Sequence, residues 1–253
     1  VGLGVMGLHS LFQQKMIPFE SVMSKVWNKK IFEHIQKEVD QASKDLAEER
    51  GPCPDAAEYG INERFSNKTA IAPTASISII CGGTSPGIEP IAANSYTHKT
   101  LSGSFNVRNK YLEKILEKYG KNNDETWSSI TTNQGSVYHL DFLTKDEKDV
   151  FKTAFELDQK WIVELGADRT PHISQAQSIN IFIPADIHKR DLHQIHFQAW
   201  KKGLKSLYYC RSKSIQRAEN INSGASTDVK LNVYKTKENQ SQEIDYDECL
   251  SCQ

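Results

Sequence analysis

The stretch QSINIFIPADIHKRDLHQIHFQAWKKGLKSLYYCRS, residues 177–212, determines the fold class of this sequence. It begins with an apolar run that ends at Pro184 and predicts a strand. Residues 190–203 then carry apolar side chains at helical spacing and end in a glycine, a common helix terminator. The run around Tyr208 and Tyr209 has the composition of a second strand. Strand, helix and strand in succession predict an α/β architecture.

The two adjacent tyrosines need a separate explanation. Neighbouring side chains on a strand point to opposite faces, so a half-buried strand gains nothing obvious from Tyr208 and Tyr209 together. Aromatic filling of a buried strand is the simpler interpretation of the pair. The remaining motifs of the chain decide whether a functional interpretation is needed.

Two further helices are predicted upstream. Residues 21–49 carry apolar side chains at gaps of mostly three and four, which indicates one amphipathic helix, and the GPCP motif at residues 51–54 ends it. Cys53 therefore falls in a loop. The sequence TKDE at residues 144–147 is a capping box, and the periodic apolar residues after it predict one helix that reaches Leu165.

Length and composition limit the function classes. The 253 residues, 38% of them hydrophobic, suffice for one large domain or two small ones. With 31 basic and 32 acidic residues, the chain lacks the charge excess of a nucleic-acid binder. No apolar run approaches the roughly 20 residues of a membrane span, and the five cysteines show no disulfide framework spacing. We expect a cytoplasmic protein without membrane or nucleic-acid partners.

The sequence opens with VGLGVMGLHS and no initiator methionine, which leads us to expect the second piece of a longer or split protein. Residues 2–7 match G-x-G-x-x-G, but a dinucleotide-binding fingerprint needs a strand before it, and only Val1 precedes the first glycine. We expect these glycines to permit close backbone packing instead.

The segment APTASIS contains the strongest candidate for a ligand site. Pro73 must end any strand before it. The residues that follow offer hydroxyls and free backbone N–H groups at a predicted helix start, which suits a phosphate or diphosphate; they are Thr74, Ala75, Ser76, Ile77 and Ser78. A plain Ser/Thr helix cap is the alternative. The glycine-rich GGTSPGIEP after it forms a turn or brings backbone close to a ligand.

Residues 213–253 differ in composition from residues 1–212. They are rich in Ser, Asn, Gln, Lys and Glu, and such a segment cannot bury enough apolar surface to offset its ordering entropy. We therefore expect a flexible tail. Cys249 and Cys252 form a C-x-x-C near its end. A zinc site needs about four ligands, whereas a tethered dithiol suits thiol–disulfide exchange; an accidental pair on a disordered end is the alternative.

The remaining histidines and cysteines are given structural interpretations. We predict no metal site: His188, His193 and His196 fit a solvated helix surface. Cys81 and Cys210 lie in apolar runs and are predicted to be buried.

Taken together, the motifs GLGVMGLHSLF, APTASIS, GTSPGIEP, RTPHISQAQSIN, AWKKGLKSLYYCRS and the terminal cysteine pair resemble the large (α) subunit of class I ribonucleotide reductase. The resemblance covers essentially the whole chain. Enzymes of this family reduce ribonucleoside diphosphates by radical chemistry. The resemblance implies that residues 1–212 are the C-terminal part of a ten-stranded α/β barrel with a small C-terminal α/β region, and that residues 213–253 are a flexible, redox-active tail.

The resemblance also implies a role for each motif. The segment from Pro73 to Ser78 would bind the substrate phosphates. Many relatives have a hydroxyl residue at the position of Ile77, whose own side chain has none, so Ile77 would contribute only its backbone. Tyr208 and Tyr209 would pass a radical from the small (β) subunit to an active-site cysteine. Cys249 and Cys252 would re-reduce the active-site disulfide and be reduced by thioredoxin or glutaredoxin. No cofactor is expected in this chain, because the metal cofactor of the small subunit would supply the radical.

One family feature is absent from the sequence. The Asn-x-Cys-x-Glu loop that carries the family's thiyl radical does not occur, and no cysteine stands in that context. We therefore expect activity only together with an N-terminal portion of the large subunit and a small subunit. The alternative is a non-catalytic partner or remnant that keeps the fold and the phosphate loop.

Overall fold

The computed structural model describes residues 1–100 and 103–212. In chain order the helices are α1 (Leu8–Gln14), α2 (Val22–Arg50), α3 (Pro54–Glu58), α4 (Ala75–Ile80), α5 (Lys110–Lys118), α6 (Asp124–Thr132), α7 (Lys145–Val150), α8 (Gln159–Arg169) and α9 (Lys189–Lys201). The strands are β1 (Ser95–Thr100), β2 (Gly103–Arg108), β3 (Ile181–Ile183) and β4 (Cys210–Ser212). The predicted tail, with Cys249 and Cys252, lies outside the described residues.

The strands form two small sheets. β1 and β2 make an antiparallel hairpin in which Ser95 faces Arg108. β3 and β4 are parallel, with Ile181 opposite Cys210, and α9 connects them. The predicted order of strand, helix and strand is therefore confirmed, although the second strand begins after the tyrosine pair. Within residues 1–100 and 103–212 the sheets do not close into a barrel.

Two isolated parallel bridges extend the strand pairing towards the N-terminus. They join Leu3 to Thr69 and Ile71 to Gln177. The first explains the opening glycines, because a Cβ on Gly4 would collide with the carbonyl oxygen of Ala70. The prediction that these glycines allow close backbone packing is confirmed there.

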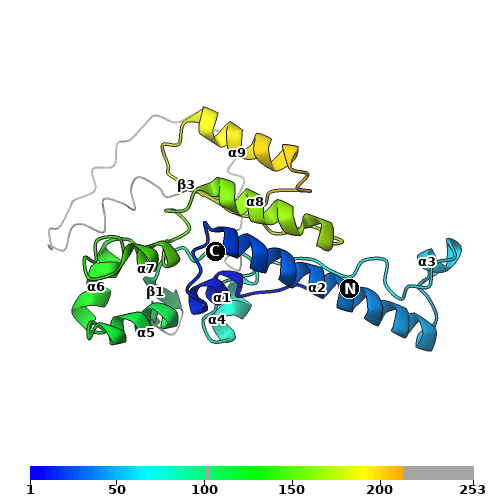
Figure 1. Cartoon of the computed structure of the whole chain (residues 1–253), viewed down its shortest axis with the longest axis horizontal. Coiled ribbons are helices and arrows are strands. Elements are labelled where there is room, and N and C mark those ends of the chain that lie inside the picture. The colour runs from blue at the N-terminus through cyan, green and yellow to red at the C-terminus, as the bar shows by residue number, and fades with distance from the viewer. Residues whose placement is uncertain (101–102, 213–253) are drawn as a thin grey trace, which may run out of the picture.

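Figure 1 shows α9, α8 and α2 in successive layers, with α5, α6 and α7 grouped to one side. Two apolar cores lie between the layers, one shared by α1, α2, α8 and β3 and one shared by α8, β3 and α9. A further core lies under α5, α6 and α7 and contains Trp127 and Phe151. None of the helices in the described part of the chain is long and apolar enough to cross a membrane.

The long helix α2 confirms the prediction for residues 21–49. Ser21 caps it by accepting the N–H of Ser24, and Gly51 follows its last residue. α2 packs along α8, where the buried guanidinium of Arg169 donates to Oδ1 of Asn28 at 3.0 Å. The guanidinium also donates to Oε1 of Gln177 at 2.5 Å, so one side chain ties three segments together.

The single helix predicted from residue 144 to Leu165 is wrong. The capping box is present, but α7 ends at Val150 and α8 begins at Gln159. Glu156 accepts hydrogen bonds from the N–H and hydroxyl of Thr153, and Asp158 caps α8 by accepting the N–H of Lys160. These local polar contacts favour turns over a continuous helix. The apolar residues on either side of the break enter different cores.

Candidate functional site

Tyr208 and Tyr209 lie immediately before β4, not within a strand. The N–H of Tyr208 donates to the carbonyl of Ile179 at 2.8 Å, and the carbonyl of Tyr209 accepts the N–H of Ile181 at 2.9 Å. These two bonds hold the pair against the segment that leads into β3.

The two phenol rings lie against each other, with centroids 4.1 Å apart and planes at 51°. The alternation that would send neighbouring side chains to opposite faces of a strand does not apply to this pair, because β4 begins only at Cys210. Tyr208 is 49% exposed and Tyr209 is 41% exposed, so aromatic filling of a buried strand is wrong. The pair is a surface contact between two phenols.

The segment from Pro73 to Ser78 makes a turn and begins α4. Thr74 has a left-handed backbone, with φ of 52°, and its hydroxyl accepts the N–H of Gly87 at 2.7 Å. It makes no side-chain cap, so the plain helix-cap alternative is wrong. The hydroxyl of Ser78 is buried and donates to the carbonyl of Ala75, whereas Ser76 and Ile77 are exposed.

The glycine-rich segment after α4 is a turn that returns to Thr74. Gly82, Gly83 and Gly87 all have positive φ. At Gly87 an added Cβ would lie 3.0 Å from the carbonyl oxygen of Ala72, so this close approach and the positive φ together favour glycine.

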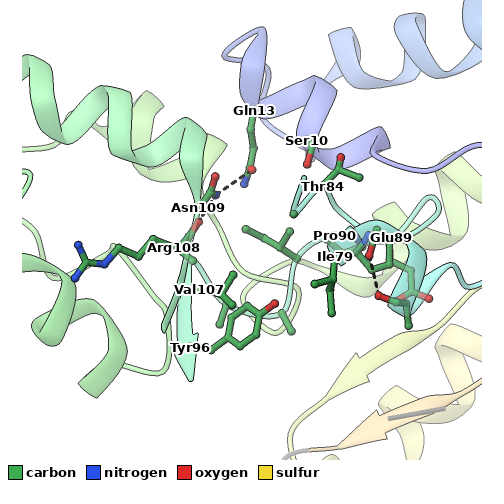
Figure 2. A pocket seen from close by; sticks show the side chains of 18 of the residues that line it. Ser10, Gln13, Ile79, Thr84, Glu89, Pro90, Tyr96, Val107, Arg108 and Asn109 are labelled. Carbon is green, nitrogen blue, oxygen red and sulfur yellow. Dashed lines mark hydrogen bonds between the residues drawn. The ribbon is translucent and has the colours of Figure 1, made fainter. Parts of the chain in front are cut away.

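A pocket of about 340 Å³ opens between this turn, α1, the β1–β2 hairpin and the β3–β4 pair (Figure 2). Residues from all of them line it, among them Ser10, Gln13, Pro73, Ser78, Glu89, Tyr96, Asn109, Phe182 and Arg211. Of the predicted phosphate-binding residues, Pro73, Ala75 and Ser78 line this pocket, and Thr74, Ser76 and Ile77 do not. The pocket therefore lies beside the predicted phosphate segment.

Helix α1 forms one wall of the pocket through buried polar side chains. Oε1 of Gln13 accepts from Nδ2 of Asn109 at 3.0 Å (Figure 2), while the Gln13 amide nitrogen has no partner among the described residues. Ser10 and Ser85 exchange two hydrogen bonds. Nδ1 of His9 accepts the N–H of Ile91 at 3.0 Å, and burial lowers the pKa of His9 to about 3.

Glu89 is a buried carboxyl group on the pocket wall, 8% exposed. Burial raises the pKa of Glu89 to about 7, although the hydrogen bond from Asn180 and the charge of Arg211 oppose this shift. Oε1 of Glu89 accepts from Nδ2 of Asn180 at 2.5 Å, and Oδ1 of Asn180 accepts the N–H of Tyr209 at 2.9 Å. The pocket wall is thus hydrogen-bonded to the tyrosine pair.

Asn180, Arg211 and the buried face of α1 were missed by the sequence interpretation. Glu89 was noticed only as part of a turn motif. A carboxylate between Ile88 and Pro90 in an otherwise apolar and glycine-rich segment was the available signal.

The predictions for the other cysteines and for the histidines have different outcomes. Cys81 and Cys210 are exposed, so the prediction that they are buried is wrong. Cys81 follows the exposed end of α4, and among the described strands β4 pairs with β3 alone. The three histidines are exposed as predicted, with His188 capping α9. The part of the chain that the structure describes holds no group of three or more side chains suited to a metal ion.

Comparison with known proteins identifies the family. The family described as "Ribonucleotide reductase, barrel domain" matches residues 1–58 and 55–210. The chain belongs to this family.

Several relatives are named as large subunits of ribonucleotide reductases. The chain is 48% identical over 227 residues to the ribonucleoside-diphosphate reductase large subunit of Invertebrate iridescent virus 6, a match that covers 88% of this chain and 24% of the relative. It is 38% identical over 253 residues to the putative ribonucleoside-diphosphate reductase large subunit of Frog virus 3, a match that covers 100% of this chain and 42% of the relative. The chain thus spans about a quarter to two fifths of the length of these ribonucleotide reductase subunits.

A solved ribonucleotide reductase structure shares the fold. The class Id ribonucleotide reductase α subunit of Actinobacillus ureae matches with a TM-score of 0.78 and 39% sequence identity. The match covers 86% of this chain and 40% of that chain. The described helices and strands therefore correspond to a part of a ribonucleotide reductase α subunit.

Proposed function

We propose that the chain forms part of the large subunit of a class I ribonucleotide reductase, which converts ribonucleoside diphosphates to deoxyribonucleoside diphosphates. The tyrosine pair carries this proposal: its ring centroids are 4.1 Å apart in a chain of this family. Contact between two phenols supports a one-electron relay. Each phenol can give up one electron together with its phenolic proton and recover both from the next group.

The radical would arrive from a partner. A small (β) subunit with a metal cofactor would oxidise the pair, and the pair would in turn oxidise a cysteine in the N-terminal portion of the large subunit. Tyr208 and Tyr209 are each about half exposed, which supports delivery from another subunit. No cofactor is proposed for this chain itself.

The segment from Pro73 to Ser78 would bind the substrate diphosphate. The first N–H groups of α4 have no partner within the helix, and the exposed Ser76 hydroxyl lies among them. Gly87 holds Thr74 in a left-handed turn at the helix start. These donors support an anion site in the position that the sequence predicts.

Cys249 and Cys252 would renew the enzyme after each turnover. The pair would give two electrons and two protons to the active-site disulfide and become a disulfide itself, which thioredoxin or glutaredoxin would reduce. The 40 positions from Tyr209 to Cys249, at roughly 3.3 Å each when extended, give the pair a reach above 100 Å.

Replacing Tyr208 by phenylalanine tests the relay. The change removes the phenolic proton and little volume, so folding should survive at a cost of about 1 kcal/mol or less. Deoxynucleoside diphosphate formation should fall to background, because phenylalanine cannot pass the radical. The assay contains the rest of the large subunit, a small subunit and the reductant.

Tyr59→Phe is the matched control, because Tyr59 is 77% exposed and belongs to the end of α3, outside the pocket wall. It should retain full activity. Substantial turnover by Tyr208→Phe would remove the relay assignment.

A further inference from the structure

Asn180 joins the pocket wall to the tyrosine pair, and the proposed function makes no use of it. Its side chain is buried, with 1% exposed, directly before β3. The amide nitrogen donates to Glu89 at 2.5 Å, and the amide oxygen accepts the N–H of Tyr209 at 2.9 Å. One amide group therefore connects residues that are distant in sequence.

The orientation of this amide is fixed by its two partners. A reversed amide would place its NH2 group against the Tyr209 N–H and its oxygen against the Glu89 carboxyl group. Neither pairing is a hydrogen bond when Glu89 is ionised. The Asn180 oxygen accepts the backbone N–H of Tyr209, and its position therefore depends on the hydrogen bond that the same amide makes to Glu89.

Arg211 provides a second connection between the same two groups. It lies on β4 and lines the pocket, and its charge favours the ionised form of Glu89. Its guanidinium carbon lies 5.9 Å from the centre of the Tyr209 ring. Electrostatic interactions are strong where water is excluded. Ionisation of Glu89 should therefore change the electrostatic environment of the Tyr209 ring through Arg211.

The other ionisable groups near Glu89 differ from it in pKa. Burial holds the pKa of His9, on α1, at about 3 and raises the pKa of Tyr96 on the hairpin. Arg108 on the same hairpin is paired with Asp124. Burial also raises the pKa of Cys210, next to Tyr209. The pKa of Glu89, about 7, stands apart from these groups.

We propose that Asn180 is a positioning residue that couples the ionisation of Glu89, on the pocket wall, to the placement of Tyr209. An anion in the pocket would favour the protonated carboxyl group, so the tyrosine pair would also respond to pocket occupancy. The consequence for radical transfer rests on the proposed function, whereas the coupling itself does not.

The coupling can be measured without any assay of turnover. The probe is 3-fluorotyrosine at position 209 in the full 253-residue chain, observed by 19F NMR as the pH is raised. In the otherwise unchanged chain the resonance should move in one step with its midpoint near pH 7. The phenol's own titration gives a second step, which Glu89→Gln should leave in place.

Two substitutions distinguish the parts of the connection. Glu89→Gln keeps an oxygen to accept from Asn180 and cannot ionise, so the step should disappear. Asn180→Ala leaves Glu89 free to ionise and removes the amide, so the amplitude of the step should fall several-fold. Thermal denaturation checks that each variant is folded, and Asn180→Leu, which cannot ionise either, replaces Asn180→Ala if the latter is not.

Two controls exclude other sources of the step. A 3-fluorotyrosine at the exposed Tyr59 should show no step near pH 7. His196 lines a second pocket with Tyr208, so the step must survive His196→Gln.

A step near pH 7 that persists in Glu89→Gln would overturn the proposal, and so would the absence of this step in the unchanged chain. A full-sized step in Asn180→Ala would overturn the role of Asn180 and leave the coupling to Arg211. Because no activity is measured, loss of the relay assignment through an active Tyr208→Phe enzyme would not alter this result.

Discussion

Burial favours the uncharged forms of two side chains, His9 on α1 and Glu89 on the pocket wall. It lowers the pKa of His9 to about 3 and raises the pKa of Glu89 to about 7. The directions are opposite because the charged form of one is a cation and that of the other is an anion. For His9 the neutral ring is also a structural requirement, since Nδ1 must accept the N–H of Ile91.

His9 should make the fold sensitive to mild acid. Its pKa is about 3 in the native state against an ordinary 6.5, so the unfolded chain binds more protons below about pH 6.5 and native stability is lost as the pH falls. His9→Asn keeps an acceptor for Ile91 but cannot ionise. Between about pH 7.5 and 5.5 the wild type should lose about 1 kcal/mol more of unfolding free energy than His9→Asn in urea titrations.

His193→Asn is the matched control, because His193 is exposed on α9. Its pH dependence should equal that of the wild type. If the wild type and His9→Asn lose stability equally over this pH range, the buried neutral histidine is not the cause.

The functional role of a residue can be predicted from sequence when its type is unusual for its position in the chain. Tandem tyrosines at positions 208 and 209 are of this kind, and both were selected. Asn180 is an ordinary residue in an apolar run, and its two partners lie 91 and 29 positions away in the sequence. Its role comes from the tertiary arrangement, which no local pattern encodes.

Helix α4 and the turn after it form the element that presents the predicted phosphate site. The Thr74 hydroxyl closes this element by accepting the N–H of Gly87. A β-branched residue at φ of 52° is unfavourable in isolation, so the turn must be held by its neighbours. Thr74 thus has a structural role in addition to any contact with a ligand.

Two substitutions in this element should separate structure from binding. Thr74→Val leaves the Gly87 N–H without its partner and should cost about 1–3 kcal/mol of stability, and it should also weaken substrate diphosphate binding. Ser76→Ala changes an exposed hydroxyl and should weaken binding alone. A bond to a charged group is worth about 1.5–3 kcal/mol, so we expect the dissociation constant to rise about tenfold or more.

Calorimetric titration of a ribonucleoside diphosphate into the assembled large subunit measures the binding, and thermal denaturation measures the stability. Thr74→Ser keeps the hydroxyl and is the control for both. A dissociation constant that is unchanged in both Thr74→Val and Ser76→Ala would contradict the phosphate assignment.

At the scale of elements, sequence patterns predicted α2, β3 and α9 because each is followed by a clear stop signal: Gly51 after α2, Pro184 after β3 and Gly203 after α9. They failed between α7 and α8 because the apolar spacing of a helix continues across the break while Thr153 and Asp158 make turn contacts. The apolar pattern alone cannot show that Phe151 and Leu157 belong to different cores.

At the scale of the whole molecule, the motifs are more informative than the periodicities. The described strands are three to six residues long, and two further pairings are single bridges. Such short strands leave little signal in composition, so the sheets of this fold could not be worked out from residue patterns. The combination of APTASIS, SPGIEP and tandem tyrosines pointed to the family, and the family match over residues 1–58 and 55–210 agrees.

The central claim is that this chain works as part of a ribonucleotide reductase. The direct measurement is deoxynucleoside diphosphate formation from a labelled ribonucleoside diphosphate. The complete mixture contains this chain, the rest of the large subunit, a small subunit and thioredoxin with its reductant. We predict product in the complete mixture and none when the chain is omitted or carries Tyr208→Phe. Product formed at the same rate without the chain, or no product in the complete mixture, would contradict the claim.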